Sequence, residues 1–451
     1  MITKQEAQDL THKVLQRCGS DPAEVVLVAR DDVLTRFANN TIHQNVAELD
    51  LNLVLKVFVD GSVGTATTNR MGPDDWDALI ARARQNAAAS PEEPDHPGLA
   101  DPAEFPDLQA YDQAAAEFAP KARAEQVGGV CRAAEQQGLN ASGAFSTGVR
   151  FVAVANSRGL FAYHRGTHAD FQTVVMAEDA SGRAQASGWR LHDVPVENVG
   201  REALRKAANG RDPQNIEPGA YTVVVDPYVT QDLLYMLDLY GMGALSVLEG
   251  RSWMNERIGE RAMSPLISIW DDGLDLNGLP QPFDYEGTPR QRVDIVTQGV
   301  VQAPVHDRRT AQKMGQASTG HAISSLVPTF MRTFGPLAFN LFMAPGEASL
   351  EEMIASTERG LYITRFWYTR LVHPSDCVVT GMTRDGVFLI TDGEISHPVK
   401  NLRFTQSYVE ALNNVEAVGN ETLLLAEGDG RMLFRVPALK IRAFNFTGST
   451  L

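Results

Sequence analysis

The sequence has few cysteines, no long apolar run and little positive charge for its length. Its three cysteines, Cys18, Cys131 and Cys377, lie far apart and form no CxxC pair. Their odd number and wide spacing argue against a disulfide framework and favour a reducing cytoplasm. No apolar run approaches the roughly 20 residues that cross a bilayer, so no membrane partner is expected.

Acids outnumber bases: 56 Asp and Glu stand against 40 Lys and Arg in 451 residues, for a net charge of −16. Such a chain repels phosphates, so broad nucleic-acid binding is not expected, and the simpler meaning of the charge is solubility. The first 19 residues have the pattern of an amphipathic helix and lack the apolar core of a signal peptide, which again favours the cytoplasm.

Common catalytic and phosphate-binding motifs are also missing. Ser246 lies in ALSVL rather than in GxSxG, and neither VGTATTN nor GMGALS completes a phosphate-binding glycine motif. The sequence therefore gives no direct sign of a serine hydrolase or of a nucleotide-binding enzyme.

The N-terminal half contains clear strand and helix patterns. Residues 24–69 alternate apolar and polar side chains and predict an antiparallel meander of three or four strands, and further strands are predicted over 141–190 with a hairpin turn at 156–159. Helices are predicted over 3–17, 73–90, 111–137 and 196–209, with the pair Gly128–Gly129 as the expected point of interruption in the third.

Gly, Pro and polar residues concentrate at 210–219 and predict a domain boundary. A buried strand and a helix over about 228–248 are predicted next, followed mostly by short strands with few helices. We therefore expect an α+β fold of two domains: residues 1–215 with antiparallel meander units and helices, and residues 216–451 as a β-rich α+β domain.

Stretches along nearly the whole chain resemble the TldD/PmbA family, which is also called the modulator-of-gyrase family. In the N-terminal half these are LTRFANNTIHQNV (34–46) and ANSRGL (155–160). In the C-terminal half they are RSWMNERIGERAMSPLISIWDDG (251–273), FDYEGTPRQR (283–292), STGHA (318–322), APGEASLEEMIASTERGLYIT (344–364) and DGEISHPVKNLRFTQ (392–406). Each stretch is weak by itself, but their common order and spacing make the resemblance strong.

The resemblance implies a cytoplasmic metalloprotease assembly of two subunits that acts on unfolded or flexible peptides. One subunit, of the TldD type, carries zinc on a helix with the pattern HExxxH, and a Cys near its C-terminus completes the ligands. The other subunit, of the PmbA or TldE type, lacks these ligands and pairs with the first.

The resemblance assigns the zinc helix to residues 241–249, which read GMGALSVLE in this chain. No His occurs there, Glu249 is the only acid, and residues 422–451 contain no Cys. A hydrolytic zinc site needs about three imidazole, thiolate or carboxylate ligands and a water. We therefore expect no metal and no catalytic residue in this chain, and zinc in a TldD-type partner.

The resemblance thus predicts a non-catalytic PmbA/TldE-like subunit, paired with a TldD-like zinc chain as a heterodimer and binding unstructured peptides along a sheet edge. Two alternatives stay open. The chain could be an enzyme by itself through an unrecognised site, such as His373, Cys377 and His321, or a homodimeric peptide-binding module without protease activity.

Two segments hold the candidate contacts with a peptide or with the partner subunit. His321 and Thr319 belong to STGHA, which the resemblance places near the cleft, although a hydrogen-bonded loop histidine is a simpler role for His321. The second segment, RFWYTR, stands where the family commonly has a Gly-rich stretch.

The candidates in RFWYTR are Arg365, Trp367, Tyr368 and Arg370, residue types that are enriched at interfaces. In the alternative, Phe366 and Tyr368 pack inward on a strand while Trp367 faces solvent.

Two further pairs have simpler explanations. His164 and His168 in HRGTH would share one face of a strand, and we expect a surface pair. Asp284 and Glu286 have the residue types of glycosidase carboxylates, but turn chemistry and pairing with the arginines of PRQR account for them.

Overall fold

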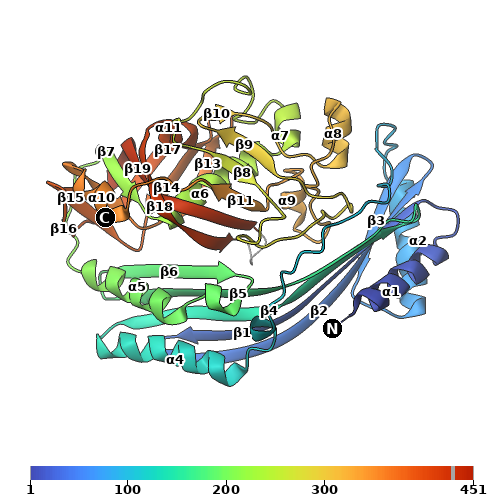
Figure 1. Ribbon diagram of the computed structural model, residues 1–451, viewed down its shortest axis with the longest axis horizontal. Helices are drawn as coiled ribbons and strands as arrows, with labels where there is room; N and C mark the ends of the chain where they lie inside the picture. Colours follow the sequence, from blue (N-terminus) through green and yellow to red (C-terminus); the bar gives the residue numbers. More distant parts are fainter. Residues whose placement is uncertain (1, 428–431, 450–451) are drawn as a thin grey trace.

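Two β-sheets organise the chain (Figure 1). The computed structural model describes residues 2–427 and 432–449. A six-stranded sheet comes from the N-terminal half and a thirteen-stranded mixed sheet from the C-terminal half, so the predicted α+β fold is confirmed. Within the described ranges, none of the helices combines the length and the apolar character that spanning a bilayer requires.

The first sheet is antiparallel throughout, with the strand order β3-β2-β1-β4-β5-β6. Its strands are β1 (Ala23–Ala38), β2 (Thr41–Val59), β3 (Ser62–Thr68), β4 (Asn140–Asn156), β5 (Phe161–Met176) and β6 (Ser181–Gly188). The helices of this half are α1 (Lys4–Arg17), α2 (Pro73–Ala89), α3 (Gln113–Ala116), α4 (Pro120–Gln136), the 3₁₀ turn η1 (Leu191–Asp193) and α5 (Val196–Asn209). The predicted meander and hairpin are both present.

The helix predicted over 111–137 is in fact two helices, α3 and α4. The break lies before Pro120, where Ala119 is extended, and α4 continues through Gly128–Gly129. Proline has no backbone N–H and disfavours a helical residue before it, so it begins a helix better than it continues one.

The two faces of the first sheet pack against different parts of the molecule. On β1, Val25 and Leu27 point toward α1 and α2 and join their apolar core. Val26 and Val28 point the other way, where they pack with Phe283 of the C-terminal half. Successive side chains of a strand alternate between faces, so one strand supplies both cores. Figure 1 shows the C-terminal half on one side of this sheet and α4 on the other.

The second sheet follows the linking residues 210–218 and is mixed, as β11–β19 and β7–β12 are parallel pairs. Its strands are β7 (Gly219–Val225), β8 (Ile269–Asp271), β9 (Val293–Thr297), β10 (Val300–Val301), β11 (Asn340–Met343), β12 (Arg359–Ile363), β13 (Phe366–His373), β14 (Val378–Thr383), β15 (Val387–Thr391), β16 (Glu394–Pro398), β17 (Leu402–Ser407), β18 (Val415–Glu427) and β19 (Met432–Ser449). The helical segments are α6 (Pro227–Leu237), the π turn η2 (Asp238–Met242), α7 (Ala244–Leu248), α8 (Arg308–Met314), α9 (Thr329–Arg332), α10 (Leu350–Ala355) and α11 (Tyr408–Asn413). This half is β-rich, as predicted.

A buried charge joins the two halves. Lys206 of α5 has a side chain that is 3% exposed, and its Nζ lies 2.6 Å from Glu202 Oε1 and 2.7 Å from Asp226 Oδ2. Asp226 directly precedes α6. Burial alone would lower the pKa of Lys206, but Asp226 and Glu202 raise it well above its usual value. The ammonium therefore stays charged and bridges the two halves.

Replacing Lys206 with Ala leaves Asp226 buried without its cation, so we expect the free energy of unfolding to fall by about 3–5 kcal/mol. Arg201→Ala removes an exposed pair with Glu197 on the same helix and should change it by less than about 0.5 kcal/mol. Urea unfolding followed by circular dichroism measures both variants. Equal losses would contradict the bridging role of Lys206.

Candidate functional site

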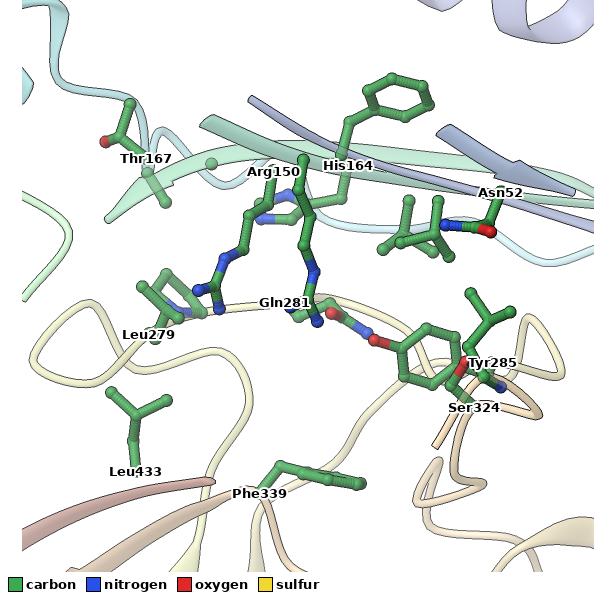
Figure 2. A pocket seen from close by; sticks show the side chains of 18 of the residues that line it. Asn52, Arg150, His164, Thr167, Leu279, Gln281, Tyr285, Ser324, Phe339 and Leu433 are labelled. Atoms are coloured by element: carbon green, nitrogen blue, oxygen red, sulfur yellow. Dashed lines mark hydrogen bonds between the residues drawn. The ribbon is translucent and has the colours of Figure 1, made fainter. Parts of the chain in front are cut away.

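A cavity of about 370 Å³ lies between the first sheet and loops of the C-terminal half (Figure 2). Figure 2 shows Arg150 and His164 reaching from the sheet toward the loop that carries Leu279 and Gln281. Tyr285 lines the same space from the C-terminal half. The size is typical of a small-molecule site, and the position between two packed units is a common one for such sites.

The strand register explains why charged side chains gather at this cavity. Arg30 of β1 lies opposite Asp50 of β2 and Arg150 of β4, so three charged residues form a row across the sheet. On the same face of β1, two residues earlier, Val28 pairs with Val152. The face therefore changes from an apolar contact with the C-terminal half to a polar cavity wall within one step of the strand period.

A second cavity of about 670 Å³ adjoins the first and shares Arg30, Arg150, Leu279 and Leu433 with it. It follows the sheet face further along the strands. The charged and imidazole side chains that it adds are Asp32, Arg36, Glu48, His168, Asp170, Arg183 and Glu427.

The structure corrects the expected surface pair of His164 and His168. They share one face of β5 as predicted, but both line cavities, and His168 is only 7% exposed with Nε2 3.3 Å from Asp32 Oδ1. Burial lowers the pKa of His164 to about 4 and that of His168 well below its usual value. Both rings are therefore neutral at pH 7.

This burial predicts a pH dependence of stability. The unfolded chain binds a proton at His164 more readily than the folded chain, because the folded pKa is about 4 and the ordinary value is 6.5. The contribution of the neutral His164 ring to the free energy of unfolding is complete above pH 6.5 and is lost as the pH falls toward 4.

Between neutral pH and pH 4, His164→Gln should lose about 1–3 kcal/mol less of its free energy of unfolding than the wild type, because Gln binds no proton in this range. Scanning calorimetry across this range measures the difference. His43 is exposed on β2, and His43→Gln serves as the control that keeps the wild-type profile. Parallel profiles for the wild type and His164→Gln would contradict this assignment.

Buried side chains at both ends of residues 237–254 pack into the core, whereas residues 248–250 are exposed. Trp253 is fully buried, and its Nε1 donates a hydrogen bond to the Leu237 carbonyl at 2.9 Å. Its indole fills the space beside Gly241, where a Cβ atom would come within 2.0 Å of the ring. Met242 and Ala244 are also fully buried, whereas Leu245 and Val247 are partly buried and Leu248 is exposed.

The helix predicted over about 228–248 is in fact interrupted. α6 passes into the π turn η2, and Gly243 is extended before α7 begins. Val305 explains the break, because it accepts a hydrogen bond from the Ala244 amide and donates one to the Met242 carbonyl, both at 2.9 Å. A strand-like pairing with a distant segment thus replaces helical hydrogen bonds.

The side chains of residues 241–249 do not fit a zinc ion. The only acid, Glu249, is exposed at the C-terminal end of α7 and lies 2.6 Å from Arg251. Elsewhere, Cys377 is fully buried, which raises its pKa, whereas His373 is exposed. In the part of the chain that the structure describes, no three His, Cys, Asp or Glu side chains are grouped as metal ligands would be.

His321 and the partly buried Thr319 lie in a hydrogen-bonded loop. His321 is completely buried, with Nε2 2.8 Å from Asp271 Oδ1 and Nδ1 2.9 Å from Thr319 Oγ1. Asp271 also accepts a hydrogen bond from the Asn340 amide at 2.7 Å. This position is not compatible with a contact between the His321 side chain and a peptide, and it fits the alternative role of a hydrogen-bonded loop histidine.

The RFWYTR segment leads into β13 and presents two of its aromatic side chains, Trp367 and Tyr368, to solvent. Trp367 is 39% exposed and lies between Arg365 and Arg384, whose guanidinium carbons are 4.7 and 4.9 Å from its ring. Tyr368 is 64% exposed and has the Arg370 guanidinium 4.3 Å from its ring.

The expected inward position is correct for Phe366 and wrong for Tyr368. Phe366 packs 4.3 Å from Phe404, centroid to centroid. Tyr368 has a positive φ of 55°, and the pairing with β14 shifts between Trp367 and Arg370. This irregularity resets the alternation, so Trp367 and Tyr368 both point outward. None of the six predicted contact residues lines the cavities.

Asp284 has the turn role that the sequence predicts. Its Oδ1 accepts hydrogen bonds from the amides of Glu286 and Thr288, and its Oδ2 accepts one from Ala322, all at 2.9 Å. Burial raises the pKa of Asp284 and the nearby Arg290 acts in the opposite direction, which fits the expected pairing with an arginine of PRQR. Glu286 instead approaches Lys56 of β2 at 4.0 Å.

Sequence comparison identifies the class of protein as metallopeptidase-related. Profiles of PmbA/TldA metallopeptidase domain 1, central domain and C-terminal domain match residues 23–87, 92–211 and 218–448. The chain therefore belongs to the PmbA/TldD metallopeptidase family. The first two profiles cover the six-stranded sheet and the third covers the thirteen-stranded sheet.

Among its relatives, metalloprotease PmbA of Escherichia coli O157:H7 is 24% identical over 457 residues, 93% of this chain and 94% of that protein. A metalloprotease of Methanothermobacter thermautotrophicus is 26% identical over 227 residues, 50% of this chain and 48% of that protein. The chain thus spans about half the length of the first curated relatives that it matches.

Two solved structures show the same fold. TldE from Thermococcus kodakarensis superposes with a TM-score of 0.87 at 18% identity, covering 98% of this chain and 100% of that one. A protein from Thermotoga maritima MSB8, described as a modulator of a DNA gyrase, gives 0.86 at 20% identity, with 99% and 100% covered. At these identities the likeness concerns the fold alone.

Proposed function

We propose that this chain is a non-catalytic, PmbA/TldE-like subunit of a cytoplasmic metalloprotease complex that acts on unfolded or flexible peptides. Its partner is a TldD-like chain that holds the zinc, and the two form a heterodimer. Family membership supports the metalloprotease part of this proposal. The observation that carries the non-catalytic role is the segment 241–249, where the buried Met242 and Ala244 serve packing and the one acid pairs with Arg251.

Strand β13 is the surface that best fits a partner or an extended peptide. In the described residues it pairs with β14 on one edge only. Trp367 and Tyr368 stand exposed beside this edge, each against an arginine. An open edge supplies main-chain hydrogen bonds with little sequence demand, and aromatic and Arg side chains supply much of the binding energy at interfaces.

The first test compares this chain alone with a mixture of this chain and a TldD-like partner. Metal analysis and cleavage of an unstructured peptide are the measurements. We expect neither bound zinc nor cleavage for this chain alone, because residues 241–249 offer no ligand set. Both should appear in the mixture. Stoichiometric zinc and cleavage by this chain alone would overturn the proposal in favour of an independent enzyme.

The second test concerns the β13 surface. Replacing Trp367 and Tyr368 together with Ser should weaken association with the TldD-like chain by at least about tenfold, because exposed aromatics are typical hot spots. Phe330→Ser on α9 removes an equally exposed aromatic ring and is the control. Analytical ultracentrifugation of the mixtures measures both. An unchanged dissociation constant for the double variant would exclude β13 from the interface.

A further inference from the structure

The cavity of about 370 Å³ has a local excess of positive charge in a strongly acidic chain. Arg30 and Arg150 from the sheet and Arg290 from a C-terminal loop line it, and Asp50 is the one acid among the described residues of its lining. Figure 2 shows the Arg150 side chain extending into the space between sheet and loops. A net charge of −16 makes three arginines at one cavity an unexpected concentration.

Arg290 is the clearest sign that an anion belongs here. Arg290 is only 5% exposed, and its Nε has no hydrogen-bond partner among the described residues. The guanidinium carbon is 5.4 Å from the centre of the Phe339 ring, which holds the group in place without supplying an acceptor for Nε. A buried cationic N–H without an acceptor is costly, so a bound acceptor would relieve a real deficit.

The remaining walls limit the rest of the ligand. Apolar side chains from both halves line the cavity, and they include Val28, Val152, Pro280, Leu326 and Phe339. Uncharged polar groups come from Asn52, Gln281, Tyr285 and Ser324. A ligand with one anionic group and an apolar body matches this lining better than a fully polar one.

The charge balance favours a carboxylate over a phosphate. Asp50 lines the same cavity, and Asp32 and Glu48 line the adjoining one, so a dianion meets repulsion that a monoanion partly avoids. No lining residue of the first cavity belongs to a helix, so no helix N-terminus directs amides at the ligand as in many phosphate sites.

We propose that this cavity binds the carboxylate of a small amphipathic ligand, with Arg290 and Arg30 as the cations that hold it. The arginine fork matches the two carboxylate oxygens, and Phe339 with the valines of the sheet covers the apolar part. The carboxylate comes either from the C-terminus of a peptide or from a free organic acid. This inference does not rest on the role as a subunit, because it concerns this chain alone.

The experiment is isothermal titration calorimetry of the full chain with three probes. These are N-acetyl-Ala-Ala-Phe with a free carboxylate, the same tripeptide as its C-terminal amide, and 4-phenylbutyrate. We expect the tripeptide acid to bind at least about tenfold more tightly than the amide, since only the acid pairs with the arginines. If 4-phenylbutyrate binds as tightly as the tripeptide acid, the site takes free organic acids. If the tripeptide acid binds and 4-phenylbutyrate does not, the site takes peptide C-termini.

Arg30→Met and Arg290→Met should each weaken binding of the acid by about tenfold while leaving the amide unchanged. Arg36→Met is the matched control, because Arg36 lies on the same face of β1 but lines only the adjoining cavity. Circular dichroism checks folding, and Arg30→Met decides the test if Arg290→Met does not fold. Equal binding of acid and amide, no heat with any acid at millimolar concentration, or an equal loss in Arg36→Met would overturn the proposal.

Discussion

The two-residue period of the long strands in the first sheet is the constraint on which the rest of the structure depends. One face of β1 is apolar where it meets helices, and the opposite face carries Val26 and Val28 before it changes to Arg30. The strand register thus places Val26 and Val28 against the C-terminal half and Arg30 at the point where this packing ends and the cavities begin. A shift of the strand register by one residue would exchange the two faces of β1, and it would remove both the packing against the C-terminal half and the cavities.

Buried charges fix how the two halves meet. Lys206 bridges α5 to Asp226 before α6, and Lys56 joins Glu24 of β1 at 3.0 Å while approaching Glu286 at 4.0 Å. Burial raises the pKa of Glu286 to about 8, with Lys56 acting in the opposite direction. Buried ion pairs need a more exact geometry than apolar contacts need. They therefore hold the cavity walls in one relative position.

Local sequence signals predicted most of the elements and failed where a distant segment changed the backbone. The meander, the hairpin and α2 follow from alternation, turn residues and an N-terminal proline. The helix through Gly243 did not form as predicted, because Val305 pairs with the backbone on either side of it. Tyr368 faces outward for a similar reason, since pairing with β14 shifts at that point and no local pattern encodes the shift.

The sequence by itself determined the family, the α+β class and the chemistry of residues 241–249, because side-chain types and their order are sufficient for these. It also showed that His164 and His168 share a strand face. Only the tertiary structure decided what lies over that face. Arg30, Arg150 and Arg290 are far apart in the chain, and each alone is an ordinary surface residue type. They line one cavity because strand register and the docking of the C-terminal half bring distant segments together.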